Sequence, residues 1–460
     1  MSNNANDRRY WLRAGTLTLL EKGSGLVLAL GTAMLLLRGL SKPVFATWAL
    51  FVLITYFLEM GRSGLLQNGL MRQLALHRGQ AKEEAGFVQA AWLINLLYSL
   101  AGMVLLWLLA PWLIQQYQAP GLAGILPVYS AIILLMAVMG QANYLQQAHF
   151  EFRGIFWSNL LLRGAVFIWA LVCKITSRPL QLEELALAMG FGAATGAVAS
   201  WLFAQRFLPR QPWRLSYILP SAGKLLAYGK FVLGTNLSTM FYKNVDKLTL
   251  GQLLGPAAFA VYDAAGKVTQ LVEAPSFSIA AVVFPQSAAR MISDGPAAVQ
   301  RLYERSVGAI LCMVLPFVVA VILFAGPIIR ILAGDAYSDA ADVLRLTALF
   351  GLFLPFAVQF GTVLDSTGRP GVNFMGTLAT AVVNLTLSYL MVQRFGIMGA
   401  ALATLMGYAL AMVWMQWYLN RHYGVKGWRA FVHMTYFYRI GWRMAKQFLT
   451  KNETKIHAGP

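Results

Sequence analysis

The chain has 460 residues, of which 58% are hydrophobic and only 12% charged, and its mean hydropathy is +0.59. Soluble proteins average about 45–50% apolar and about 25% charged residues. A soluble enzyme, a coiled coil and a disordered protein are therefore excluded, and a bilayer must surround most of the chain. The charge is unusual, because 37 Lys and Arg stand against 18 Asp and Glu and give a net charge of +19.

Apolar segments long enough to cross a bilayer recur along the whole sequence. A helix spans the hydrocarbon core with about 20 residues, and by this measure we predict an all-α membrane protein with about twelve transmembrane helices. Arg8, Arg9 and Arg13 precede the first segment, which is too long for a signal peptide and is predicted to be a retained anchor. The predicted spans cover residues 14–38, 44–61, 86–109, 123–147, 155–175, 182–205, 226–250, 257–284, 307–332, 343–366, 373–393 and 397–420.

The basic residues at the loop ends predict the orientation, because cytoplasmic loops carry an excess of Lys and Arg. Most of them lie before the first span, between residues 62 and 84, between 206 and 224, and after 420. In this assignment Arg62 is the first residue of a cytoplasmic loop. The opposite loop ends carry only Arg38, Lys42, Lys174, Arg178 and Arg394. Both termini are therefore predicted to be cytoplasmic.

A short internal repeat divides the spans into two halves. Residues 40–48 (LSKPVFATW) align with residues 254–262 (LGPAAFAVY), each after the first span of six. Two six-helix halves of one orientation are typical of transporters whose substrate path lies between the halves. We predict an N-terminal half over residues 1–222, a C-terminal half over 223–420 and a basic cytoplasmic tail over 421–460. The tail mixes aromatic and basic residues, which suits either an interfacial helix on an anionic leaflet or a loosely ordered segment.

Charged residues within the spans are the candidates for function, since a cation near the bilayer centre costs about 2.5–3.5 kcal/mol. Lys230, Arg330 and Arg345 lie near span ends and can reach the interface. The candidate substrate-path cations are Lys22, Arg163, Lys243, Lys247 and Lys267. The candidate acids for ion coupling or charge balance are Glu59, Asp246, Asp263 and Glu273.

The spans at 226–250 and 257–284 carry the clearest pattern of these charges. At 100° per residue, one polar stripe runs along the first of them through Asn236, Thr239, Lys243, Asp246 and Lys247. Asp263 and Lys267 stand at i, i+4 in the next span and can pair. The acidic and basic residues within the spans are nearly equal in number, which predicts a hydrated cavity lined by both positive and negative charges. Binding an anionic head group, carrying a proton or sodium ion, and simple neutralisation all remain open.

The sequence offers no chemistry for an enzyme or a metal centre. Cys173 and Cys312 lie far apart in apolar runs, and neither a disulfide framework nor a metal site is expected. The histidines are scattered without metal-ligand spacing. We therefore expect no catalytic residues, no metal and no cofactor, with a proton or sodium ion as the one candidate coupling partner.

Several segments resemble landmarks of a known family. Residues 246–255 (DKLTLGQLLG), followed by Phe259, Tyr262, Ala264, Ala265 and Lys267, resemble the start of the second half of bacterial oligosaccharide flippases. The further landmarks are Phe284-Pro285, residues 336–341 (AYSDAA), residues 367–370 (TGRP) and residues 396–404 (GIMGAALAT). The resemblance is to the Wzx-type flippases, the polysaccharide transporter branch of the multidrug/oligosaccharidyl-lipid/polysaccharide exporter superfamily.

This resemblance implies a bacterial inner-membrane protein that turns an undecaprenyl-diphosphate-linked oligosaccharide from the cytoplasmic to the periplasmic leaflet. Transport would proceed by alternating access coupled to an ion gradient, for export of a surface polysaccharide such as lipopolysaccharide or exopolysaccharide. Membrane lipid, a polysaccharide polymerase and a chain-length regulator are the implied partners, and nucleic acid is not. The candidate lysines and Arg163 would then bind the diphosphate.

Three alternatives stay open beside the flippase. A multidrug exporter of the same superfamily would favour acids over the lysines seen here. A flippase for the lipid-linked peptidoglycan precursor shares the chemistry but matches the landmarks less well. A membrane glycosyltransferase or acyltransferase would need a catalytic constellation, which the short loops do not supply.

Overall fold

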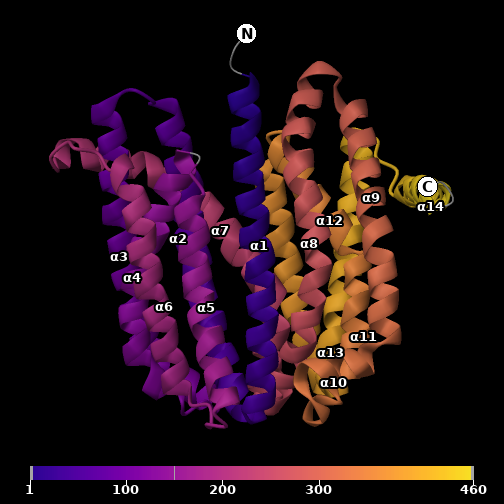
Figure 1. Cartoon of the computed structure of the whole chain (residues 1–460), viewed down its shortest axis with the longest axis horizontal. Helices are drawn as coiled ribbons and strands as arrows, with labels where there is room; N and C mark the ends of the chain where they lie inside the picture. The colour runs from indigo at the N-terminus through magenta and orange to yellow at the C-terminus, as the bar shows by residue number, and fades with distance from the viewer. Residues whose placement is uncertain (1–3, 150, 457–460) are drawn as a thin grey trace. The chain divides into compact units, whose positions relative to one another are not determined.

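The protein is described here from a computed structural model that covers residues 4–149 and 151–456 (Figure 1). Within these ranges the chain folds into helices without a β-strand, which confirms the predicted fold class. The α-helices are α1 (Asn4–Gly39), α2 (Lys42–Leu76), α3 (Ala81–Gln116), α4 (Leu122–Ala148), α5 (Arg153–Ile175), α6 (Leu182–Ala204), α7 (Leu215–Leu254), α8 (Pro256–Ser293), α9 (Pro296–Leu323), α10 (Ala325–Ala333), α11 (Ala340–Ala348), α12 (Leu354–Ser366), α13 (Pro370–Tyr423) and α14 (Arg429–Ile456). Short 3₁₀ turns occupy Gln205–Phe207, Asp335–Tyr337 and Leu349–Leu352.

Nine helical segments of the described chain are long and apolar enough to cross a membrane, which makes this a multi-pass membrane protein. One of them, α13, contains a break at Gly396, whose backbone (φ 61°, ψ −139°) is not helical. The break lies between the predicted spans 373–393 and 397–420. Helix α7, which carries the predicted polar stripe, and helix α8 are not among the nine. The predicted total of twelve and the orientation of the termini stay predictions.

Many helix boundaries differ from those predicted, and three of the differences bear on the sites described below. Helix α2 continues past residue 61 to Leu76, because Leu65, Leu66, Leu70 and Leu74 extend its buried face. Helix α7 begins at Leu215, before the predicted span 226–250, and contains Pro220. The predicted span 307–332 is divided between α9 and the short helix α10.

The chain divides into two compact units, which are described separately below. The first unit consists of Met1–Phe241, Leu254–Ala260 and Ile331–Gly334, and the second of Tyr242–Leu253, Val261–Arg330 and Asp335–Pro460. This division falls within α7. The predicted limits of the two halves at residue 222 and of the tail at residue 421 stay predictions.

In the first unit, helices α2 to α6 run side by side (Figure 1). Its core is built from α2, α3 and α4, with Leu66, Leu70, Phe87 and Tyr144 among the buried residues. Helices α5 and α6 approach closely, because a Cβ on Gly192 would lie 2.9 Å from the carbonyl oxygen of Leu162. Such close approach at small residues is the usual way in which helices pack in membranes.

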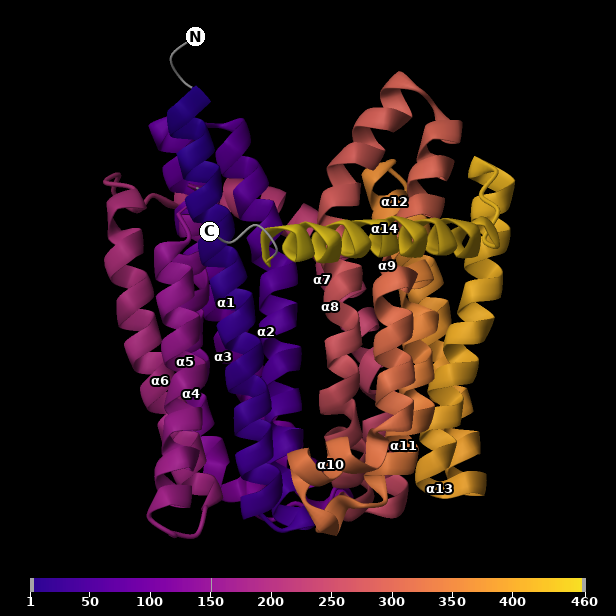
Figure 2. The ribbon, with the colours of Figure 1, turned by 45° about the vertical axis from the view of Figure 1, so that its right-hand side comes forward.

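In the second unit, α9, α12 and α13 form a core around Tyr303, Phe356, Phe360 and Leu419. Helix α14 lies across α9 and not along it (Figure 2). Large apolar side chains cover the outside of both units, for example Leu108, exposed by 72%, and Val413, exposed by 70%. An apolar outer surface of this extent is expected where lipid surrounds the protein.

Candidate functional site

The structure brings three of the predicted residues together in one ion-paired group on α7 and α8. Lys247 Nζ lies 2.7 Å from Asp263 Oδ1, and Lys267 Nζ lies 3.1 Å from Asp263 Oδ2. The Asp263 side chain is only 4% exposed, whereas the side chain of Lys267 is 26% exposed. Two lysines share one carboxylate, so this lysine–aspartate group carries one net positive charge. An excess cation inside a span is expensive unless a ligand or water solvates it.

A second ion pair joins the same two helices at another position along them. Lys243 Nζ lies 2.7 Å from Glu273 Oε2, and it also lies 5.1 Å from the centre of the Phe277 ring. Both partners of the pair remain partly exposed. Because the charges cancel, this pair neutralises itself and leaves no excess charge for a substrate.

Asp246 on α7 differs from the other candidate acids, because hydroxyl and amide groups surround it instead of cations. Ser388 and Thr404 of α13 each donate a hydrogen bond to one of its carboxylate oxygens. Tyr262 donates to Oδ2 at 3.3 Å, and Asn384 Nδ2 donates to Oδ1 at 3.4 Å. Within the described chain, no lysine or arginine forms an ion pair with Asp246, which is 3% exposed.

A buried carboxylate without an ion-paired cation is costly away from water, and a proton or a bound cation would remove that cost. The oxygen atoms of Ser388, Thr404 and Tyr262 are hard ligands of the kind that small cations prefer. The side-chain oxygen of Asn384 is also buried and, in the described part of the chain, has no hydrogen-bond partner. This oxygen-rich cluster around Asp246 is therefore suited to hold a proton or a monovalent cation.

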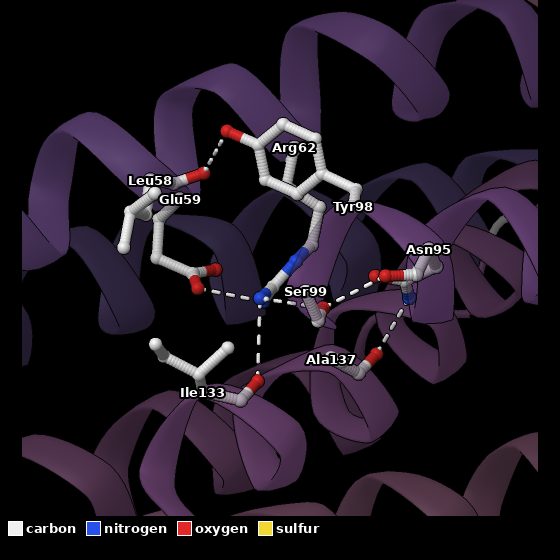
Figure 3. Close-up of polar contacts among 8 residues, drawn as sticks. All are labelled: Leu58, Glu59, Arg62, Asn95, Tyr98, Ser99, Ile133 and Ala137. Carbon is white, nitrogen blue, oxygen red and sulfur yellow. Dashed lines mark hydrogen bonds and ion pairs between the residues drawn. The ribbon is translucent and has the colours of Figure 1, made fainter. Parts of the chain in front are cut away.

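Glu59 belongs to a polar network in the first unit, on α2 (Figure 3). Its partner is Arg62, one helical turn later, whose Nη1 lies 2.6 Å from Glu59 Oε1. Arg62 Nη2 also donates to Ser99 Oγ on α3 and to the Ile133 carbonyl on α4, both at 3.2 Å. The Arg62 side chain is fully buried. The network thus ties three helices of the first unit together through one guanidinium.

Lys22 and Arg163 do not join these groups. The Lys22 side chain is 78% exposed and lies 3.7 Å from its neighbour Glu21. Arg163 of α5 is exposed and rests on α1, where a Cβ on Gly25 would lie 2.4 Å from its Nη1. No ion pair of Arg163 is found within the described residues. The nine candidate residues are therefore spread over separate places in the two units.

Sequence reasoning missed Arg62 and the hydroxyl partners of Asp246. Placing Arg62 in a cytoplasmic loop was wrong, because α2 continues beyond it and buries it. The i, i+3 spacing from Glu59 and the leucines that continue the helical period were the available signals. Asn384, Ser388 and Thr404 gave a weaker signal, since single polar residues in an apolar helix do not reveal what they face.

The fold and these polar groups define a multi-pass membrane protein with ion-paired and hydroxyl-coordinated charges inside its helices. The chain belongs to the polysaccharide biosynthesis protein family, whose sequence model matches residues 35–342. This result confirms the family resemblance seen in the sequence.

Curated relatives bear names from glycan export. The chain is 26% identical over 222 residues to the "probable low-salt glycan biosynthesis flippase Agl15" of Haloferax volcanii, covering 46% of this chain and 47% of that protein. It is 20% identical over 410 residues to the "putative O-antigen transporter" of Shigella flexneri, covering 86% of this chain and 94% of the relative. The chain thus spans about half the length of the first of these relatives and nearly all of the second.

Two solved structures show the same fold. An inward-facing multidrug transporter of the MATE family superposes with a TM-score of 0.73 at 15% identity, covering 86% of this chain and 95% of the other. The lipid II flippase MurJ superposes with a TM-score of 0.72 at 13% identity, covering 89% and 87% of the two chains. At these identities the likeness establishes the fold alone and nothing about the substrate.

Proposed function

We propose that the protein is a flippase that turns an undecaprenyl-diphosphate-linked oligosaccharide from the cytoplasmic to the periplasmic leaflet of a bacterial inner membrane. The observation that carries this proposal is the excess positive charge of Lys247, Asp263 and Lys267 inside the helices of a member of the polysaccharide biosynthesis family. A diphosphate loses its hydration when it leaves water to cross the bilayer. A group of side chains with a net positive charge can replace part of that hydration. The names of the H. volcanii and S. flexneri relatives support the same class of substrate.

The roles divide among the polar groups according to their charge. Lys247 and Lys267 would bind the diphosphate, and Asp263 would hold both ammonium groups in place between transport cycles. Asp246 would carry the coupling ion, a proton or sodium, because its carboxylate has no ion-paired cation and either ion would neutralise it. Glu59 and Glu273 already have partners in Arg62 and Lys243 and would act in charge balance.

The substrate would move by alternating access, without covalent chemistry. The protein would therefore act as a transporter and not as an enzyme, and a polymerase with its chain-length regulator would use the product on the periplasmic side. A multidrug exporter shares the fold, but a lysine-rich group with net positive charge disfavours the cationic compounds that such a cavity would have to bind.

Direct transport is the test of this proposal. Purified protein in vesicles should move a fluorescent diphosphate-linked oligosaccharide between leaflets, and a membrane-impermeant quencher added outside measures the fraction that has moved. The same lipid without its diphosphate is the matched control substrate and should move no faster than in protein-free vesicles. Absence of protein-dependent movement for every diphosphate-linked oligosaccharide tested would reject the proposed function.

Removal of one lysine tests the proposed head-group site. We expect Lys267→Gln to raise the substrate concentration needed for half-maximal transport by roughly 10- to 100-fold, because a hydrogen bond to a charged group contributes about 1.5–3 kcal/mol. The variant should fold, since Lys247 and Asp263 remain as a neutral pair. The matched control is Lys230→Gln, which removes an exposed lysine from α7 and should transport normally. Equal behaviour of the two variants would contradict the assignment.

A further inference from the structure

Helix α14 is attached to helix α9 by specific contacts. A tail that merely followed the last predicted span would not need them. Glu304 of α9, only 2% exposed, accepts a hydrogen bond from the backbone N–H of Lys426 at 2.9 Å. The same carboxylate lies 3.9 Å from Arg429 at the start of α14. At Gly308 of α9 the two helices touch, since a Cβ there would lie 2.7 Å from the Ala430 carbonyl oxygen. The crossing of α14 over α9 is therefore built into the fold (Figure 2).

This crossing lies at the level where α9 is predicted to enter the bilayer. The apolar run that defines the predicted span starts at residue 307, next to Gly308, while the preceding turns of α9 carry Arg301, Glu304 and Arg305. A helix that crosses a membrane-spanning helix at this level runs along the membrane surface. It therefore meets lipid head groups on the sides that α9 does not cover.

The sides of α14 differ in composition. Ala430 is buried against α9, and Met434 is partly buried on the same side. At 100° per residue, Phe431, Tyr438 and Trp442 lie together on one edge of the helix. All three are exposed, Trp442 by 75%. We name these three residues the aromatic edge.

The aromatic edge begins at a contact with the core of the second unit. The Phe431 ring lies 6.1 Å from that of Phe356, which belongs to the first turn of α12, far from the end of that helix at Ser366. Phe356 packs with Tyr303 and Phe360 in the buried core of the second unit, so this end of the aromatic edge meets apolar protein. Arg439 and Arg443 are exposed and occupy the helix surface beyond the aromatic edge.

We propose that α14 is a binding site for anionic phospholipid. The aromatic edge lies below the lipid phosphates, and Arg439 and Arg443 bind them. Tyr438 and Trp442 each combine an apolar body with a polar tip, and such residues favour this depth. Each basic residue near an anionic membrane surface adds about 1 kcal/mol of attraction, so the chemistry of this helix fits an anionic lipid surface.

Spin labels measure the depth of the two sides of α14. The full-length protein, with Cys173→Ala and Cys312→Ala, carries a label at Tyr438→Cys in one sample and at Tyr436→Cys in the other. In nanodiscs that contain phosphatidylglycerol, the label at 438 should be more accessible to oxygen and less accessible to a water-soluble nickel chelate than the label at 436. Equal accessibility to the chelate at the two positions, as expected if α14 faces water or another protein, overturns the proposal.

A second measurement tests the selectivity for anionic lipid. Phosphatidylglycerol added to the purified protein should raise its unfolding temperature more than phosphatidylcholine does, because a ligand of the native state stabilises it. The Arg439→Gln/Arg443→Gln variant should lose at least half of that extra shift. The matched control, Arg421→Gln/Lys426→Gln, removes two charges that lie outside α14 and should keep it. The same shift in both double variants would refute the role of the two arginines.

Discussion

Asp246→Asn is expected to abolish the coupling of transport to the ion gradient while leaving the protein folded. Asparagine has nearly the same shape and can still accept and donate hydrogen bonds to Ser388 and Thr404. It cannot gain or lose a proton, and it attracts a cation only weakly. One charge moved across 100 mV is worth about 2.3 kcal/mol, so the wild-type protein can hold a leaflet gradient of about 50-fold for each 100 mV. The Asp246→Asn variant should instead bring the substrate to equal concentrations in the two leaflets.

The measurement is the steady-state distribution of the fluorescent lipid with and without an imposed proton or sodium gradient. Imposing the gradients one at a time identifies the ion. Asp365→Asn is the matched control, because Asp365 accepts hydrogen bonds from Asn373 near the end of α12 and has no proposed role in coupling. Coupling that survives in Asp246→Asn would exclude Asp246 as the carrier. Coupling that is lost equally in both variants would show that the effect is not specific to this cluster.

The second large effect is expected at Arg62, whose replacement by Met should destabilise the protein by about 3–5 kcal/mol. The change leaves the Glu59 carboxylate, 23% exposed, without its cation. It also removes the donor to Ser99 and to the Ile133 carbonyl in the interior of the first unit. The unfolding temperature in detergent, measured beside the wild-type protein, checks this expectation.

Replacing both members of the pair separates stability from function. The double variant Glu59→Met/Arg62→Met should recover most of the lost stability, since two apolar residues of similar volume often replace a buried pair without cost. If the pair serves only to balance charge, the double variant should also transport normally. An Arg62→Met protein as stable as the wild type would show that the network of Figure 3 contributes little to the fold.

The architecture could be predicted because the bilayer imposes it on the sequence. Every backbone group must find a hydrogen-bond partner within the membrane, so long apolar segments fold as helices. The break between the last two predicted spans coincides with Gly396, whose positive φ a glycine adopts without strain. Lys247, Asp263 and Lys267 could also be identified as candidates from the sequence. The i, i+4 spacing of Asp263 and Lys267 places both on one face of a helix, where they can pair.

The partners of each charge could not be predicted in the same way. Asp246 meets Ser388 and Thr404 only because α7 packs against both parts of α13, and these residues lie far apart in the sequence. Arg62 is buried only because α2 continues past it between α3 and α4. Helical periodicity shows which side chains share a face, but it does not show which other helix covers that face.

The sequence by itself determined that this is a helical, multi-pass membrane protein of the polysaccharide biosynthesis family with charges inside its helices. The tertiary structure alone decided which of those charges are compensated. It pairs Glu59 with Arg62 and Lys243 with Glu273, leaves a net positive charge on the Lys247, Asp263 and Lys267 group, and surrounds Asp246 with hydroxyls. The physical reason is that hydropathy depends on each residue separately, whereas the free energy of a buried charge depends on the atoms within a few ångströms of it, most of which come from other helices.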